Sequence, residues 1–275
     1  MFDIFASADA WVALVTLTFL EIVLGIDNII FISIASSKLP KDQQKKATNI
    51  GLILAMVMRI VLLFGISLLV AMEAPFWHIN LPWIKAGISG QALILFGGGL
   101  FLLYKSVHEI HGKVDLSGEE EEEVKAKSSS TLSSAITQIA LINVVFSFDS
   151  ILTAVGMTNG LSEDPNDALI LMIVAVVISV LIMMLFATPV GRFVNKHPSV
   201  QILGLSFLIL IGFMLIAEAA HLSHLNILGS EVGTIPKGYL YFTIAFSLFI
   251  EFLNFRLRKK SKTVAGGVMP KENPV

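Results

Sequence analysis

Residues 20–33 read Leu20-Glu21-Ile22-Val23-Leu24-Gly25-Ile26-Asp27-Asn28-Ile29-Ile30-Phe31-Ile32-Ser33. The stretch is apolar enough to cross a lipid bilayer, yet it contains two carboxylates, an amide and a glycine. A charged side chain at the centre of a membrane span costs about 2.5–3.5 kcal/mol on insertion scales. We therefore expect a partner, a water-filled cavity or a bound cation to offset the burial of Glu21 and Asp27.

A second stretch repeats this pattern. It reads Ile142-Asn143-Val144-Val145-Phe146-Ser147-Phe148-Asp149-Ser150-Ile151-Leu152-Thr153. In both stretches a polar residue precedes an aspartate by six positions, and a small polar residue and two apolar residues follow that aspartate. The aspartates are Asp27 and Asp149, so the sequence indicates an internal repeat built around them.

The composition is that of an integral membrane protein. The chain has 275 residues, of which 55% are hydrophobic and 15% charged, and its mean hydropathy is +0.81. Soluble domains contain about 25% charged residues. The absence of cysteine excludes disulfides, thiolate metal sites and iron–sulfur clusters. The N-terminal segment has no Lys or Arg of the kind that precedes a cleaved signal peptide, so we expect the first span to remain in the mature protein.

Seven apolar stretches are long enough to form transmembrane helices, each of which needs about 20 residues. We place them at residues 11–35, 48–72, 91–111, 133–156, 168–189, 200–220 and 238–257. The fold class expected is therefore an all-α polytopic membrane protein. Residues 73–90 carry tryptophans and prolines typical of a membrane interface, and residues 112–131 form an acidic, solvated linker.

The distribution of basic residues predicts the orientation. With the N-terminus outside, 15 of the 19 Lys and Arg residues fall in cytoplasmic segments. Only Lys85 and Lys237 fall outside, while Arg59 and Lys105 lie within spans. This asymmetry follows the positive-inside rule, and seven crossings take the C-terminus to the cytoplasm.

The two aspartate stretches lie on the first and fourth spans, an offset of three, so Asp27 and Asp149 are expected on helices that run in opposite directions. The third helix of each half also ends in a similar way, at Glu109 and His111 and at Glu218 and His221. These features predict two inverted three-helix repeats, with the substrate site near mid-membrane between them. The expected divisions are a first repeat, a cytoplasmic linker, a second inverted repeat, an outer loop with a seventh helix, and a disordered tail, at residues 1–111, 112–131, 132–222, 223–260 and 261–275.

The side chains in these stretches offer carboxylate, amide and hydroxyl oxygens. Such donors suit Mg²⁺, Ca²⁺ or Mn²⁺ better than copper or zinc. The candidate ligands are Asp27, Asp149, Glu21, Asn28, Asn143 and Ser150. On an unbroken helix Glu21 and Asp27 are about 9 Å apart along the axis, so a shared ion would need local unwinding, which we expect at Gly25.

Other interpretations of these polar residues remain open. Arg59 lies at a depth comparable with Glu21, and an ion pair between them would need no further function. For Asp27 and Asp149 the corresponding alternative is a purely structural role, in which they form a row of polar contacts between helices. Lys105 is expected to anchor its helix at the inner interface. Ordinary interfacial polarity or a gate and proton path would explain a further group, Glu109, His111, Glu218, His221 and Glu251.

Four motifs resemble the TerC family of integral membrane proteins, named for tellurium resistance. They are Glu21 to Asn28, Gly97 to His111, Phe146 to Ser150 and Glu251 to Asn254, within a likeness that covers about residues 10–260. The resemblance implies a prokaryotic inner-membrane protein with two inverted three-helix halves and an additional helix. It also implies manganese export, with the acidic residues of the two aspartate motifs binding the ion. Asn143 departs from the family pattern, because relatives often carry an acidic residue there.

The expected function is export of Mn²⁺ from the cytoplasm by alternating access. Proton antiport is the expected coupling, because burial favours the neutral form of a carboxylate, which then exchanges protons for metal. The expected partners are the dication, protons and the lipid bilayer, without nucleic acid, and the oligomeric state is left open. We find no pattern typical of an enzyme and expect no cofactor. The alternatives are export of another hard dication such as Ca²⁺, or a non-transporting factor in membrane assembly or stress resistance.

Overall fold

The computed structural model describes residues 5, 7–37, 39–65, 68, 71–115, 131–158 and 165–265. Within these ranges, the side chains of residues 24, 26, 27, 115, 149, 165, 255 and 258–265 lie outside the description. The chain divides into two units, Met1–Thr234 and Ile235–Val275, and each is described by itself. Most of the acidic linker and the end of the expected disordered tail fall on residues that are not described.

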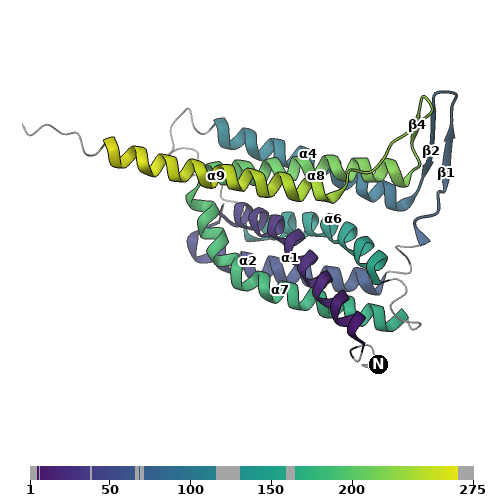
Figure 1. Cartoon of the computed structure of the whole chain (residues 1–275), viewed down its shortest axis with the longest axis horizontal. Coiled ribbons are helices and arrows are strands. Elements are labelled where there is room, and N and C mark those ends of the chain that lie inside the picture. The colour runs from purple at the N-terminus through teal and green to yellow at the C-terminus, as the bar shows by residue number, and fades with distance from the viewer. Residues whose placement is uncertain are drawn as a thin grey trace, which may run out of the picture. The chain divides into compact units, whose positions relative to one another are not determined.

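The described residues of the first unit form six long helices, which Figure 1 labels. Their bounds are α1 Ala8–Ser37, α2 Lys41–Phe64, α4 Gly90–Asp115, α6 Leu132–Thr158, α7 Pro165–Lys196 and α8 Pro198–Leu222. All six are long and apolar enough to cross a membrane, and they are the only such helices found among the described residues. In hydrocarbon every backbone polar group needs an internal partner, so long apolar stretches form helices. The predicted multi-pass helical architecture is thus confirmed for six spans.

Two helix boundaries differ from the predicted ones. The second span was expected to continue to residue 72, but α2 ends at Phe64, where the Gly65 N–H donates to the Val61 carbonyl at 3.1 Å. The second unit contains α9, Lys237–Ala265, which extends beyond the expected end of the seventh helix and into the expected tail. Helix α9 is not among the six candidate spans, so the seventh crossing remains a prediction.

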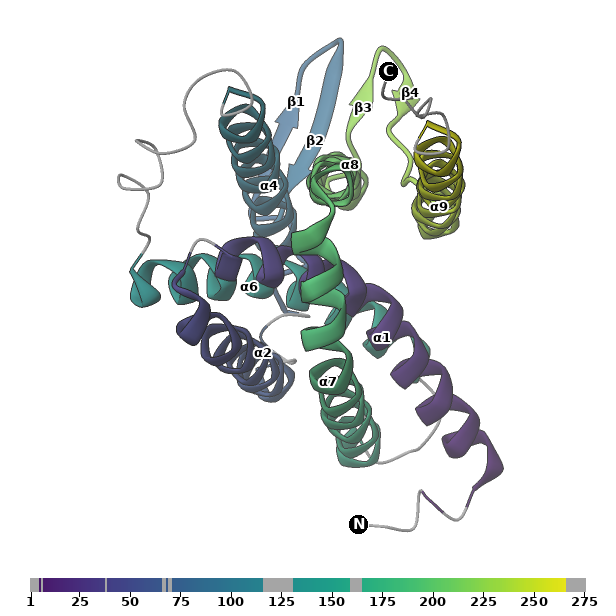
Figure 2. The same ribbon diagram turned by 90° about the vertical axis from the view of Figure 1, so that its left-hand side faces the viewer.

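The helices of the first unit pack in pairs that are distant in sequence. Helix α4 packs against α8, α1 against α7, and α2 against both α6 and α7 (Figure 2). At the α4–α8 contact, a Cβ added to Gly99 would lie 2.7 Å from the Gly212 carbonyl oxygen. A Cβ added to Gly212 would lie 3.0 Å from the Gly99 carbonyl oxygen. Glycine at both positions therefore lets the two backbones approach closely, as small residues do between membrane helices.

A small antiparallel sheet joins two loops at one end of the first unit. Its strands, in the order β1-β2-β3-β4, are Trp77–Asn80, Ile84–Ile88, Asn226–Ile227 and Ser230–Glu231. Strand β1 pairs with β2 in a hairpin, and β2 pairs with β3, placing Ile84 opposite Ile227. The expectation of an all-α chain with an irregular interfacial loop at residues 73–90 is corrected here. The sheet depends on pairing between loops far apart in sequence, which local periodicity does not reveal.

Candidate functional site

Arg59 of α2 connects the two helices that carry the aspartate motifs. Its Nη1 donates to the Glu21 carboxylate on α1, and its Nε donates to the Ser147 hydroxyl on α6 at 3.3 Å. Arg59 is 2% exposed, so its charge is neutralised within the protein. Glu21 and Arg59 therefore form the ion pair that the sequence allowed as an alternative to an ion-binding role for Glu21. A buried pair of this kind is costly to break, because the remaining charge loses its partner.

This junction brings the two aspartate stretches together. Asp27 lies six residues after Glu21 on α1, and Asp149 lies two residues after Ser147 on α6. The two helices contact each other and cross with opposed chain directions (Figure 2). The side chains of both aspartates lie outside the described residues, so their convergence on one ion remains a prediction.

Uncharged side chains that offer oxygen atoms as metal ligands are buried on the same two helices. Asn28 is 5% exposed, and its Oδ1 accepts no hydrogen bond from the described residues. Asn143 donates through Nδ2 to the Ile139 carbonyl at 2.9 Å, and Ser150 donates through Oγ to the Ser147 carbonyl at 3.2 Å. Because Asn143 and Ser150 direct their hydrogens to their own helix, their oxygen atoms remain oriented as acceptors. Asn28 on α1 and Asn143 and Ser150 on α6 thus each supply a buried oxygen atom of the kind that binds a hard cation.

Gly25 does not interrupt α1, which is a continuous helix from Ala8 to Ser37. The expected unwinding is therefore wrong, and the glycine instead allows close packing. A Cβ at Gly25 would collide with the Sδ atom of Met183, a residue of α7 that is 3% exposed. The close approach of α1 and α7 is thus a feature that the sequence analysis missed.

The described side chains do not form a cluster typical of a metal site. Among them, no three His, Asp or Glu residues converge so as to hold an ion. Asp27 and Asp149, the main ligands predicted, are not part of that set, and Glu21 is engaged by Arg59. The metal assignment therefore depends on the two aspartates.

Lys105 and Glu109 form an ion pair within α4. The Lys105 Nζ atom lies 2.8 Å from Glu109 Oε1, and the Glu109 side chain is 7% exposed. Lys105 was expected to act as an interfacial anchor, but its ammonium group is held by the carboxylate one turn further along the helix. Glu109 is thus a buried, charge-balanced group near the C-terminal end of α4.

The remaining gate or proton-path candidates are dispersed. His221 lines a cavity of about 580 Å³ together with Glu73 and His224, and its Nδ1 atom is buried without a hydrogen-bond partner. Glu218 is partly buried one turn earlier on α8, whereas His111 is exposed on α4. Glu251 accepts a hydrogen bond from Asn254 at 3.4 Å within α9. Of these candidates, His221 is thus the residue that the structure places at the cavity described here.

Long apolar helices that enclose a neutralised ion pair and buried oxygen donors are typical of a multi-pass integral membrane protein. The chain matches the family described as the integral membrane protein TerC family over residues 6–264, and it belongs to that family. It is 45% identical over 253 residues to the UPF0053 inner membrane protein YgdQ of Escherichia coli, covering 92% of this chain and 95% of YgdQ. A UPF0053 protein of Haemophilus influenzae is 42% identical over 95% of this chain and its own full length.

A longer relative shares the same region. The UPF0053 inner membrane protein YoaE of Escherichia coli is 41% identical over 89% of this chain but only 42% of its own length. No solved structure matches the chain. The family and the six apolar helices together define a multi-pass inner membrane protein.

Proposed function

We propose that this protein exports a divalent cation from the cytoplasm and that this cation is Mn²⁺. The observation that carries the proposal is the junction at Arg59, which holds both aspartate-bearing helices together deep in the helical unit. The Glu21–Arg59 pair is neutral as a whole. Asp27 and Asp149 then supply two negative charges that balance a dication. Asn28, whose Oδ1 accepts no hydrogen bond from the described residues, offers a further oxygen ligand.

The pairing of helices supports two inverted repeats. If α1, α2 and α4 exchange with α6, α7 and α8, the α1–α7 contact becomes the α2–α6 contact, and both are present. The α4–α8 contact maps onto itself, and its reciprocal approach at Gly99 and Gly212 fits this exchange. In inverted-repeat transporters the substrate binds near mid-membrane between the repeats. Asp27 and Asp149 lie on the equivalent helices α1 and α6.

The sheet and the basic residues support an orientation with the N-terminus outside. The sheet connects the loop after α2 with the loop after α8, and both contain few basic residues. Lys41 and Lys45 lie at the opposite end of α2, and Arg192 and Lys196 lie at the end of α7. Under the positive-inside rule the sheet then lies on the outer side. The seventh crossing by α9 belongs to this proposal.

A flux assay with purified protein in liposomes tests the proposal. Mn²⁺, Ca²⁺, Mg²⁺ and Zn²⁺ are supplied separately, and the flux is compared for wild type, Asp27→Asn and Asp149→Asn. We expect Mn²⁺ flux in wild type and at least about a tenfold loss in each variant, as for the removal of a charged ligand. Asp9→Asn is the matched control, because Asp9 is an acidic residue in the first turn of the same helix.

The pattern of fluxes separates the candidate functions. Ca²⁺ flux with the same dependence on Asp27 and Asp149 would retain the site and change the cargo. Wild-type protein that moves none of the four dications would contradict transport and favour the non-transporting membrane factor. Unchanged Mn²⁺ flux in both aspartate variants would exclude these residues as ligands.

A further inference from the structure

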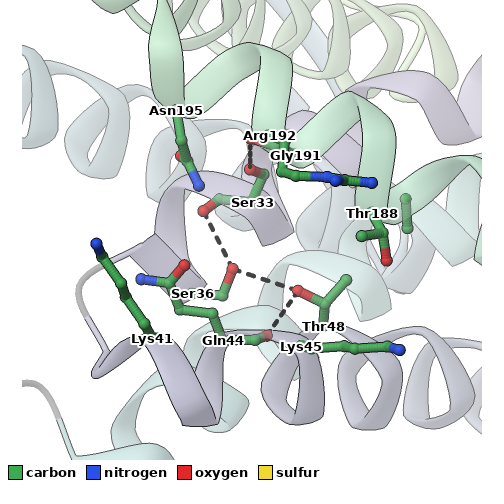
Figure 3. A pocket seen from close by; sticks show the side chains of 11 residues that line it. Ser33, Ser36, Lys41, Gln44, Lys45, Thr48, Thr188, Gly191, Arg192 and Asn195 are labelled. Atoms are coloured by element: carbon green, nitrogen blue, oxygen red, sulfur yellow. Dashed lines mark hydrogen bonds between the residues drawn. The ribbon is translucent and has the colours of Figure 1, made fainter.

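A polar cavity of about 160 Å³ lies between α1, α2 and α7 (Figure 3). It is located where α1 ends, α2 begins and α7 approaches its C-terminus. Its volume is about five times the share of one molecule in liquid water, taken as about 30 Å³. The cavity therefore accommodates a small polar ligand.

The charged side chains that line this cavity are all cationic. They are Lys41 and Lys45 from α2 and Arg192 from α7. Among the described residues, no acidic side chain lines the cavity, and none forms an ion pair with these three groups. Asp42 lies next to Lys41 in the sequence but is not part of the lining. A dication would be repelled here, whereas an anion would be attracted.

The neutral part of the lining supplies hydrogen-bonding groups held in fixed positions. Thr48 Oγ1 lies 3.3 Å from Ser36 Oγ and 2.9 Å from the Gln44 carbonyl oxygen, and Ser36 Oγ donates to the Ser33 carbonyl at 3.1 Å. Figure 3 shows these side chains between the two lysines, with Arg192 and Asn195 of α7 across from them. Because these hydroxyls direct their hydrogens to oxygen atoms of the protein, donation of hydrogen bonds to an anion here depends on Lys41, Lys45 and Arg192.

We propose that this cavity binds a phosphate-bearing anion, either the headgroup of an anionic phospholipid or a soluble phosphate. Arg presents a planar set of donors that matches phosphate oxygens, and Lys adds compact positive charges. The cavity lies on the side that the basic residues assign to the cytoplasm, where basic pockets between membrane helices bind lipid headgroups. The inference does not depend on which ion the protein transports.

The test measures two probes with delipidated, purified full-length protein. Native mass spectrometry compares the binding of phosphatidylglycerol with that of phosphatidylcholine, and calorimetry measures the binding of inorganic phosphate. The pocket variant is Lys45→Gln/Arg192→Gln. The matched control is Lys46→Gln/Lys196→Gln, which removes one exposed cation from α2 and one from α7, outside the cavity.

We expect the wild type and the control to bind phosphatidylglycerol, inorganic phosphate or both. The pocket variant should bind about 30-fold more weakly, about fivefold for each lost charge. Preferential binding of the lipid identifies a headgroup as the ligand, and binding of inorganic phosphate alone identifies a soluble one. The charge-preserving variant Lys45→Arg/Arg192→Lys should retain binding.

Two results would overturn the inference. One is a wild type that binds neither probe, and the other is an equal loss of affinity in the pocket variant and its control. If the double variant does not fold, the single variants Lys45→Gln and Arg192→Gln provide the same comparison, with about a fivefold loss expected for each.

Discussion

At the scale of single residues, the Glu21–Arg59 pair gives a direct prediction about stability. Glu21→Gln removes the charged partner and leaves the guanidinium buried against the neutral Ser147 hydroxyl. We expect a loss of about 3–5 kcal/mol, typical of breaking a buried ion pair. Thermal unfolding of the detergent-solubilised protein measures the change. The double variant Glu21→Gln/Arg59→Gln should recover part of the loss, and equal stability of wild type and Glu21→Gln would contradict a buried charge pair.

Asn28 gives a prediction that separates ligand binding from folding. Its Oδ1 accepts no hydrogen bond from the described residues, so Asn28→Ala removes no bond at that atom. We expect Mn²⁺ affinity to fall about tenfold, equivalent to about 1.4 kcal/mol, with little change in the unfolding temperature. Asn143→Ala is the comparison, because it also removes the bond to Ile139. An Asn28→Ala variant that loses stability but not affinity would exclude a ligand role.

The sequence revealed part of this residue-level detail. Pairing of Glu21 with Arg59 was foreseeable, because both lie near the middle of successive spans and unpaired charges are expensive there. The contact between Arg59 and Ser147 was not foreseeable, because it depends on how α6 is rotated against α2. Lys105 is a different case, because its partner Glu109 lies one turn away on the same helix and competes with the membrane interface for the ammonium group.

At the scale of helices, the contact between α1 and α7 depends on the absence of a side chain at Gly25. Gly25→Ala would place a Cβ against the thioether of the buried Met183, which would have to shift to make room. We expect a loss of about 1–3 kcal/mol, as for other overpacked cores, measured by thermal unfolding. Gly156→Ala on α6 is the control, because no atom lies within 4 Å of the added Cβ. Met183→Ala should rescue Gly25→Ala, and a Gly25→Ala variant as stable as the Gly156→Ala control would contradict the close approach.

Six of the helices followed from apolar length alone, since hydrocarbon permits few alternatives to a helix. The boundaries were less predictable. Helix α2 ends at Phe64 although apolar residues continue beyond it. Strands β3 and β4 were missed because they contain two residues each, and β3 pairs with a hairpin that is distant in sequence.

At the scale of the whole molecule, proton antiport predicts a signed response to a pH gradient. In liposomes with an acidic interior, outward proton flow should drive Mn²⁺ inward, and reversal of the gradient should reverse the Mn²⁺ flux. The physical reason is that protons and the dication compete for the same buried carboxylates. A Mn²⁺-sensitive dye inside the vesicles measures the flux, with a protonophore as control. Mn²⁺ movement that is unaffected by the gradient and by the protonophore would exclude this coupling.

The sheet has a mechanical consequence for such a transporter. Strand β2 lies between α2 and α4 of the first three-helix group, and β3 follows α8 of the second. Their pairing and the hydrogen bond from Gly87 N–H to Ser223 O at 2.7 Å tether the two groups at one end. Any rocking of one group against the other therefore pivots near this tether. The opposite end, where α1 meets α2, moves further in such a rotation. The transporter should therefore open more widely on that side of the membrane than on the side of the sheet.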